Sequence, residues 1–424
     1  MEEHGIEMAV IMAPDEKGLR EIFGIPAIRR LALLLARRGI REIHVVGPRH
    51  VLAPPSGHAG RPLLSDIIPA DRFHFAEDES SLDRAAKEME SRGPRKALLV
   101  RANHVIDKMS LERLTPRENG RGISFMGVSG DHGRERMYSG EIGGFLPYLK
   151  DLWGPPADRP PAPASEVKGF AGLPRTLDGS EEENRELELA LLKALRLQTK
   201  ESDGFMSRHV SRHVSQWISR RLVRTPVTPN QVTVAGAMIG LLGAYLLSCP
   251  GYWPKVAGAL LFVFCIIVDG VDGEIARLKF QESPAGHVLD LVCDNLVHLA
   301  VFLCIAWGLY RDSGSASYFY WFAALAGGAS LSGFAVSQCI SEKNPEEFRK
   351  SPRMVRLMAL LSNRDFAYLI AAIALVQGLS FFLVGAAVGS YVFAALLWAA
   401  AYRHRPSLSS SQRDAVLPVR RSGR

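Results

Sequence analysis

DGVDGEIARLKFQESPAGHVLDLVCD, residues 269–294, contains four aspartates in two regularly spaced pairs. Asp269 and Asp272 lie three residues apart, whereas Asp290 and Asp294 lie four apart, so each pair occupies one face of a helix. A short turn at the proline between the pairs would allow two helices to direct all four carboxylates into one space. The stretch therefore predicts a helical hairpin with an acidic cluster.

Apolar runs flank this hairpin, Ala257–Val268 before it and Leu296–Tyr310 after it. Carboxylates beside a membrane span cost about 2.5–3.5 kcal/mol each to insert, so they normally face a cavity and serve a function. Carboxylates without an equal number of neighbouring cations favour a bound metal, and hard oxygen ligands suit Mg²⁺ or Mn²⁺. The pattern predicts a divalent metal site rather than two solvated acidic helix faces.

The order D-x-x-D-G-x-x-A-R, eight residues, then G-x-x-x-D-x-x-x-D resembles the signature of the CDP-alcohol phosphotransferase family, and every specified position is filled. The resemblance implies transfer of a phosphate-linked alcohol group from a CDP-alcohol to an acceptor alcohol, with release of CMP. It implies two Mg²⁺ or Mn²⁺ ions and a homodimer. The implied metal ligands are Asp269, Asp272, Asp290 and Asp294, and Asp294 is also the implied general base.

The same resemblance implies a set of residues that contact the CDP-substrate. The segment TPNQVT, residues 228–233, is similar to the family's entry to its first span. A small residue allows close helix approach, and a guanidinium one turn past the metal ligands holds phosphate. The implied set is Asn230, Thr233, Gly273, Ala276, Arg277 and Gly286.

The distribution of apolar residues predicts a soluble part followed by a membrane part. The chain has 424 residues and a formal net charge of +7, and apolar runs dominate only from Val232 to Tyr402. The five cysteines all fall in this second part, without metal-ligand spacing, so we expect them in the membrane core. No signal peptide is expected, because the N-terminus opens with acidic residues. The expected spans are Asn230–Ser248, Trp253–Ala276, Gly286–Tyr310, Tyr318–Ile340, Phe366–Gln377 and Leu379–Ala401.

The loops between the expected spans predict their orientation. The loop Ser341–Asp365 and the tail from Arg403 are rich in Lys and Arg, unlike the other loops. By the positive-inside rule, the termini and the acidic cluster lie on the cytoplasmic side of a cytoplasmic membrane. The basic loop suits an acceptor phosphate, although any cytoplasmic loop is basic. Its candidate phosphate ligands are Arg349, Arg353 and Arg356.

A basic amphipathic helix is expected over Asp203–Arg224, just before the first span. Its apolar side chains form one stripe, and Trp217 suits the headgroup depth of a membrane interface. The stripe comprises Phe205, Val210, Val214, Trp217, Ile218 and Leu222.

The N-terminal part alternates strands and helices, which is typical of a parallel α/β sheet of Rossmann-like type. Strands are expected at Glu7–Met12, Glu42–Val46 and Lys96–Val100, with a helix at Ile25–Gly39. GIPAIRRLALLLARRGIREIHVV, residues 24–46, resembles part of a sugar-phosphate nucleotidyltransferase.

This N-terminal part departs from the nucleotidyltransferase pattern at its two functional segments. APDEKGLREIFG occupies the place of the phosphate loop but lacks its glycine cluster, and Asn103 and Asp107 replace the metal-binding aspartate. We expect a degenerate domain without synthesis activity; a divergent active cytidylyltransferase is the alternative.

The expected organisation is a two-domain chain, an α/β domain plus an all-α membrane domain of six helices. The α/β domain covers residues 1–178, a helical linker 179–229, the membrane domain 230–402 and a basic tail 403–424. The soluble domain and the amphipathic segment look like those of inositol-phosphate-transferring members of the family, which implies an inositol phosphate or another polar alcohol as acceptor. Synthesis of a phospholipid from CDP-diacylglycerol is the alternative. No nucleic-acid partner is expected.

Two functions of other classes are a cation transporter and a membrane scaffold. Transporter sites lie near the midplane between inverted repeats, whereas these acids lie near the expected cytoplasmic edge and DGVDG occurs once. A scaffold would tolerate loss of the aspartates.

Overall fold

The computed structural model describes residues 6–40, 42–52, 64–91, 95–114, 123–128, 135–142, 146–154, 164–177, 180–199, 204–341 and 365–403. The chain divides into two compact units. Unit 1 comprises Met1–Glu201, Val214–Pro229 and Val271–Ser283. Unit 2 comprises Ser202–His213, Asn230–Gly270 and Pro284–Arg424.

A mixed seven-stranded sheet forms the centre of unit 1, with strand order β10-β8-β9-β6-β1-β4-β5. The neighbours β6, β1, β4 and β5 run parallel, which confirms the predicted α/β region. The all-parallel sheet is wrong, because β9 runs antiparallel to both β6 and β8. The strands are β1 (Met8–Met12), β4 (Glu42–Gly47), β5 (Phe73–Phe75), β6 (Arg95–Arg101), β8 (Ile123–Gly127), β9 (Arg136–Ile142) and β10 (Ala164–Glu166).

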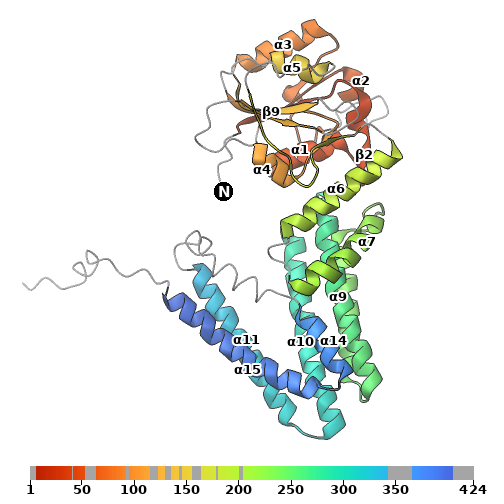
Figure 1. Cartoon of the computed structure of the whole chain (residues 1–424), viewed down its shortest axis with the longest axis vertical. Helices are drawn as coiled ribbons and strands as arrows, with labels where there is room; N and C mark the ends of the chain where they lie inside the picture. The colour runs from red at the N-terminus through yellow and green to blue at the C-terminus, as the bar shows by residue number, and fades with distance from the viewer. Residues whose placement is uncertain are drawn as a thin grey trace, which may run out of the picture. The chain divides into compact units, whose positions relative to one another are not determined.

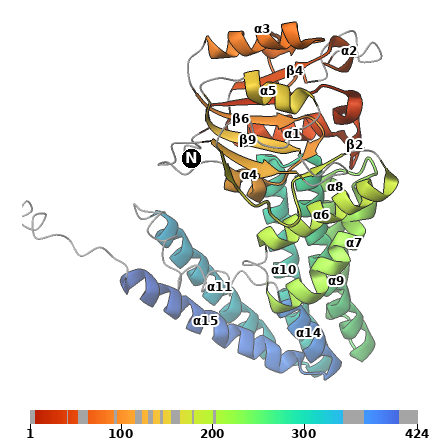
Figure 2. The ribbon, with the colours of Figure 1, turned by 45° about the horizontal axis from the view of Figure 1, so that its top comes forward.

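Helices cover both faces of this sheet (Figure 2). β1 alternates between two cores, with Ala9 and Ile11 in one and Met8, Val10 and Met12 in the other. Both faces of a central strand are therefore apolar, as in other sheets covered by helices on two sides. The first core contains residues of α1 (Ala27–Arg37), α2 (Arg49–Leu52) and α4 (Lys108–Leu114), and the second contains residues of α3 (Glu79–Glu90) and α5 (Leu146–Trp153).

A third apolar cluster extends unit 1 beyond the sheet. It joins Phe23 and Ala27 at the start of α1 to Leu191 of α6 (Glu181–Thr199) and to Leu278 near the end of α9 (Tyr252–Lys279). The last turns of α9 therefore pack within the same unit as the α/β region. Short strands complete this unit: β2 (Glu21–Ile22), β3 (Ile25–Pro26), β7 (His104–Val105) and β11 (Arg175–Thr176).

Unit 2 is helical, and helices occupy all six ranges predicted for spans (Figure 1). Four of them, α8, α9, α10 and α15, are long and apolar enough to cross a membrane. The figures show α11 and α15 side by side (Figures 1 and 2). The helices are α8 (Pro229–Ser248), α9, α10 (Pro284–Ser313), α11 (Ser317–Ser341), α14 (Phe366–Leu375) and α15 (Leu379–Arg403).

Glycines bring α8 and α9 into close contact. A Cβ atom on Gly243 would lie 2.8 Å from the Gly258 carbonyl oxygen, and one on Gly240 would lie 2.8 Å from Cys265 Sγ. Small residues allow backbones to approach in this way, which is how apolar helices associate in lipid. α9 is thereby packed against α8 directly before the aspartates.

The amphipathic segment forms a π-helical turn, Ser207–Ser211, followed by α7 (Arg212–Leu222). Val210, Val214 and Trp217 are exposed, as a membrane-facing stripe requires. The predicted single stripe needs correction at Ile218 and Leu222, which are half-buried. The buried face consists of serines at a spacing of four: Ser211, Ser215 and Ser219.

Candidate metal centre

Three of the four predicted aspartates meet in unit 2. Asp269 of α9 and Asp290 and Asp294 of α10 each offer a carboxylate oxygen, and these oxygens lie within 4.8 Å of one another. All three side chains are half-buried. Two oxygens that bind one Mg²⁺ ion at about 2.0–2.1 Å lie at most about 4.2 Å apart, so small side-chain movements would let these carboxylates share an ion.

The surroundings of the cluster suit a cation. Asp290 Oδ1 is buried and, within the described residues, has no hydrogen-bond partner. The positions before Asp269 are apolar and buried, as is Val297 after Asp294. An unsatisfied carboxylate oxygen in such a place costs free energy, and a bound cation would remove that cost. The donor set therefore fits a hard divalent metal.

Asp272 lies three residues beyond Asp269 on α9 and is only 6% exposed. It falls in the segment of α9 that belongs to unit 1. Its assignment as a fourth ligand stays a prediction.

The predicted CDP-contacting residues lie at helix termini. α8 begins at Pro229, so Asn230 and Thr233 occupy its first turn, the former exposed and the latter buried. This start agrees with the preference of proline for the first helical position. Gly286 is half-buried in the first turn of α10.

Gly273, Ala276 and Arg277 occupy the last turns of α9. A Cβ atom on Gly273 would lie 3.3 Å from Arg277 Nη2, which is the flexible end of a side chain. The contacts of all these residues with substrate stay predictions. Arg349, Arg353 and Arg356 lie outside the described residues.

Glu274, two residues after Asp272 in the same motif, is a buried acid that sequence reasoning missed. Its side chain is 2% exposed, and it accepts hydrogen bonds from Ser215 Oγ at 2.9 Å and Ser219 Oγ at 2.7 Å. The available signal was the serine spacing of four before the first span, which places hydroxyls on one helix face.

The carboxyl edge of the sheet in unit 1 is where α/β proteins bind nucleotides. Here the loop after β1 packs closely on the loop after β6, since a Cβ atom on Gly18 would lie 2.6 Å from Ala102 Cβ. Asp107 accepts hydrogen bonds from the backbone N–H groups of Met109 and Ser110, at 2.9 and 3.3 Å, and so caps α4.

A second acidic side chain near this edge, Glu135, also has protein partners. Glu135 accepts from Arg101 Nη1 at 3.0 Å and contacts His104 Nε2 at 2.8 Å, in a buried cluster. Among the residues described, no metal-ligating group of three was found at this edge.

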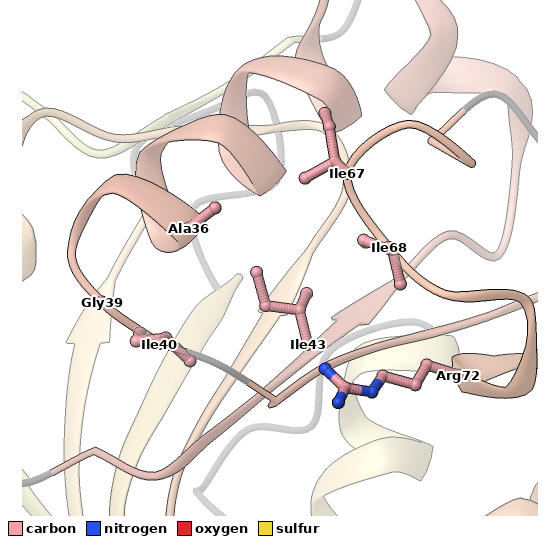
Figure 3. Close-up of a pocket in the computed structure, with 7 residues that line it drawn as sticks. All are labelled: Ala36, Gly39, Ile40, Ile43, Ile67, Ile68 and Arg72. Carbon is pink, nitrogen blue, oxygen red and sulfur yellow. The ribbon is translucent and has the colours of Figure 1, made fainter.

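A pocket of about 260 Å³ opens elsewhere in unit 1 (Figure 3). It contains Ile43 at the amino end of β4, opposite the carboxyl edge of the parallel strands, and one cationic side chain, Arg72. None of the predicted site residues line it. The lining is Ala36, Gly39, Ile40, Ile43, Ile67, Ile68 and Arg72.

Comparisons with known proteins agree with the motif. The profile of the CDP-alcohol phosphatidyltransferase family matches residues 226–400, which include the whole aspartate stretch. The chain is 32% identical over 202 residues to the bifunctional IPC transferase and DIPP synthase of Archaeoglobus fulgidus, covering 46% of this chain and 38% of that protein. It is 34% identical over 103 residues to the phosphatidylinositol phosphate synthase of Mycobacterium tuberculosis, covering 24% of this chain and 46% of that protein.

The matches span only part of these relatives. The chain covers 24% to 38% of the length of the bifunctional proteins. A crystal structure of the Mycobacterium tuberculosis phosphatidylinositol phosphate synthase with CDP-DAG bound aligns with a TM-score of 0.32 and 20% identity, over 45% of this chain and 94% of that chain. The family profile and the filled signature identify residues 226–400 as a CDP-alcohol phosphatidyltransferase domain.

Proposed function

We propose that this protein is a divalent-metal-dependent CDP-alcohol phosphotransferase of the membrane. It moves a phosphate-linked alcohol group from a CDP-alcohol to an acceptor alcohol and releases CMP. The observation that carries the proposal is the cluster of Asp269, Asp290 and Asp294, whose oxygens lie within 4.8 Å of one another inside the family-matched region.

The reaction requires one bond to form and one to break at phosphorus. The acceptor hydroxyl oxygen attacks the phosphorus that bears the donor alcohol, and the bond from that phosphorus to the oxygen bridging to CMP breaks. Asp294 takes the hydroxyl proton, and CMP leaves with the bridging oxygen and its negative charge. When bound, a divalent cation offsets the charge on the phosphates and on the departing CMP.

The remaining residues bind and orient. The proposed metal ligands are Asp269, Asp272, Asp290 and Asp294, and the proposed metal is two Mg²⁺ or Mn²⁺ ions. Gly273 and Arg277 are proposed to admit and hold the CDP-substrate; Asn230, Thr233, Ala276 and Gly286 complete that set. Arg349, Arg353 and Arg356 are proposed for the acceptor phosphate.

An inositol phosphate is the proposed acceptor. Support comes from the relatives, among which phosphatidylinositol phosphate synthases recur. CDP-diacylglycerol and a CDP-linked polar alcohol are the two donor classes to compare. A homodimer is proposed as well.

The membrane arrangement is proposed with six spans and cytoplasmic termini. Four helices that satisfy the length and composition of a span support it. The proposed domain limits are 1–178 for the α/β domain, 179–229 for the linker, 230–402 for the membrane domain and 403–424 for the tail.

The α/β domain is proposed to lack nucleotidyl transfer. Support comes from Asp107, whose carboxylate caps α4, and from Gly18, whose close approach to Ala102 leaves no glycine-rich loop open to phosphate. A cytidylyltransferase with a different site is the alternative.

The test is CMP release by the purified full chain in detergent with Mg²⁺ or Mn²⁺. The donors are CDP-diacylglycerol and CDP-inositol, each with inositol phosphate, inositol, glycerol phosphate or serine. We expect release with inositol phosphate and one donor, and loss of release on Asp294→Asn. The transporter and scaffold alternatives both predict no CMP with any pair, and that outcome would overturn the proposal.

A further inference from the structure

The end of α9, ten residues beyond Asp269, has an unusual termination. Gln281 N–H donates to the Ala276 carbonyl oxygen at 2.9 Å, and Phe280 between them adopts φ +55°. This is a Schellman-type helix end, in which glycine is the common residue. A bulky residue in this left-handed conformation costs about 1–3 kcal/mol, so neighbouring contacts must stabilise it.

Arg30 of α1 supplies the first of those contacts. Its Nη1 donates to the Leu278 carbonyl oxygen at 2.8 Å, and its guanidinium lies 5.1 Å from the centre of the Phe280 ring and 5.9 Å from that of Phe23. Only 8% of the side chain is exposed, and burial lowers the pKa of Arg30 to about 10, so it remains charged at neutral pH.

No carboxylate in the described part of the chain forms an ion pair with Arg30. The C-terminal end of α9 compensates the charge of the Arg30 guanidinium instead. The last four carbonyls of a helix lack intrahelical hydrogen-bond partners and carry partial negative charge. Two aromatic faces add cation–π attraction. Burying the Arg30 guanidinium costs free energy, which these contacts with the carbonyl and the two rings offset at this helix end.

Arg37 supplies the second set of contacts. It lies seven residues after Arg30, on the same face of α1. Its Nη2 donates to the Phe280 carbonyl oxygen at 2.5 Å, its Nη1 pairs with Glu282, and its guanidinium lies 5.1 Å from the Phe280 ring centre. The two arginines thus contact three alternate residues, Leu278 in the last turn of α9 and Phe280 and Glu282 directly after it.

This corner, residues 280–283, connects the two aspartate helices. α9 carries Asp269, and α10, which carries Asp290 and Asp294, begins at Pro284. Ending α9 one residue earlier or later changes the chain direction by about 100° and its position by about 1.5 Å. The carboxylate cluster takes Asp269 from α9 and Asp290 and Asp294 from α10, so the distances between its oxygens depend on where α9 ends.

We propose that Arg30 and Arg37 are positioning residues for the aspartate cluster, and that the α/β region serves the transferase domain as a clamp on the α9–α10 corner. The expected effect of the clamp on CMP release rests on the proposed function. Its expected effect on metal binding does not, because metal binding can be measured without turnover. It gives the degenerate domain a role that needs no nucleotide chemistry.

The experiment compares full-length variants in detergent, with Mn²⁺ binding measured by electron paramagnetic resonance and CMP release measured against Mn²⁺ concentration. Arg30→Ala and Arg37→Gln remove the two contacts, and Arg30→Lys keeps one donor without the planar stack. Arg29→Ala is the matched control, because Arg29 is on the same helix and pairs at 2.5–2.9 Å with the exposed Asp66.

We expect Arg30→Ala to raise both the Mn²⁺ dissociation constant and the Mn²⁺ activation constant by about tenfold, the scale of lost ligand support. Arg37→Gln should act in the same direction and Arg30→Lys by less, while Arg29→Ala stays at the wild-type values. Hydrogen exchange of amides 276–283 should quicken in Arg30→Ala and Arg37→Gln.

A purely structural role predicts a smaller folded fraction with unchanged Mn²⁺ constants in the folded protein, and that result overturns the clamp. If Arg30→Ala does not fold, Arg37→Gln decides alone, since its side chain is more exposed. Wild-type protein that binds Mn²⁺ but releases no CMP refutes the proposed function; the Mn²⁺ constants of the variants then still decide the clamp.

Discussion

Ser219 Oγ donates a 2.7 Å hydrogen bond to Glu274 Oε2, and this bond ties α7 to α9 two residues beyond Asp272. Ser215 Oγ donates to the other carboxylate oxygen at 2.9 Å. Both serines and Glu274 are almost fully buried. The buried carboxylate of Glu274, inside the aspartate motif, therefore serves the packing of the amphipathic helix.

Replacement of Glu274 tests this anchoring. Glu274→Ala leaves two buried hydroxyls without their acceptor, which costs about 1–3 kcal/mol. We expect a lower thermal unfolding temperature in detergent and faster proteolysis within residues 212–222. Glu274→Gln, which still accepts one bond, should lose less. The exposed Glu182→Ala is the control, and equal unfolding temperatures for Glu274→Ala and Glu182→Ala would contradict the assignment.

A second buried network in the α/β region joins two histidines. His44 Nδ1 and His74 Nε2 lie 2.8 Å apart, with Glu42 and Glu88 at the outer ring nitrogens at 3.1 and 3.2 Å. His74→Phe removes one partner of a buried pair, and we expect a loss of about 1–3 kcal/mol. Hydrogen exchange of β4 and β5 amides measures it.

The matched control for the histidine pair is the exposed His50→Phe. Replacing both His44 and His74 by Phe should cost less than the sum of the single changes, because neither ring then lacks a partner. Additive losses would show that the two side chains act independently.

Metal removal tests the acidic cluster. We expect stripping with EDTA to abolish CMP release and added Mg²⁺ or Mn²⁺ to restore it. Asp290→Asn should weaken Mn²⁺ binding by about tenfold or more, since Asp290 Oδ1 is buried and, among the described residues, lacks a hydrogen-bond partner. Asn295→Ala, an exposed neighbour on α10, is the control. Full activity after metal stripping would contradict the metal site.

The helices of unit 2 could be predicted within a few residues, because a long apolar run has no other stable form in a membrane. The meeting of Asp269 with Asp290 and Asp294 followed from helical spacing and a short turn. Both are consequences of local sequence. The number of spans stays a prediction, because only four helices satisfy the span criterion among the described residues.

Contacts between segments far apart in the chain could not be predicted from the sequence. β8 and β9 were missed, because Ile123–Gly127 and Arg136–Ile142 mix polar, charged and apolar residues without a clear alternation. The sequence pattern of α1 predicts an exposed Arg30. Its guanidinium instead donates a hydrogen bond to the carbonyl oxygen of Leu278, 248 residues away. Pairings of this kind depend on tertiary packing rather than on residue pattern.

The α/β region provides a negative prediction. Because Asp107 caps α4 and the loop after β1 packs on Ala102, we expect no pyrophosphate release from CTP and an alcohol phosphate by the full chain. The measurement is a coupled pyrophosphate assay beside CMP release from the same preparation. Pyrophosphate formed in proportion to enzyme would show that the α/β domain is a working cytidylyltransferase.

Asp294 separates the transferase from a transporter or scaffold. Asp294→Asn keeps the shape of the side chain but cannot take the acceptor proton, so we expect turnover to fall by about 100- to 10,000-fold at saturating Mn²⁺. CDP-substrate affinity should change little, because Asp269, Asp272 and Asp290 would still hold the metal. Asp272→Asn, in contrast, should weaken metal-dependent binding of the CDP-substrate itself. Turnover and CDP-substrate dissociation constants for both variants decide the matter, and wild-type turnover in Asp294→Asn would refute its role as the base.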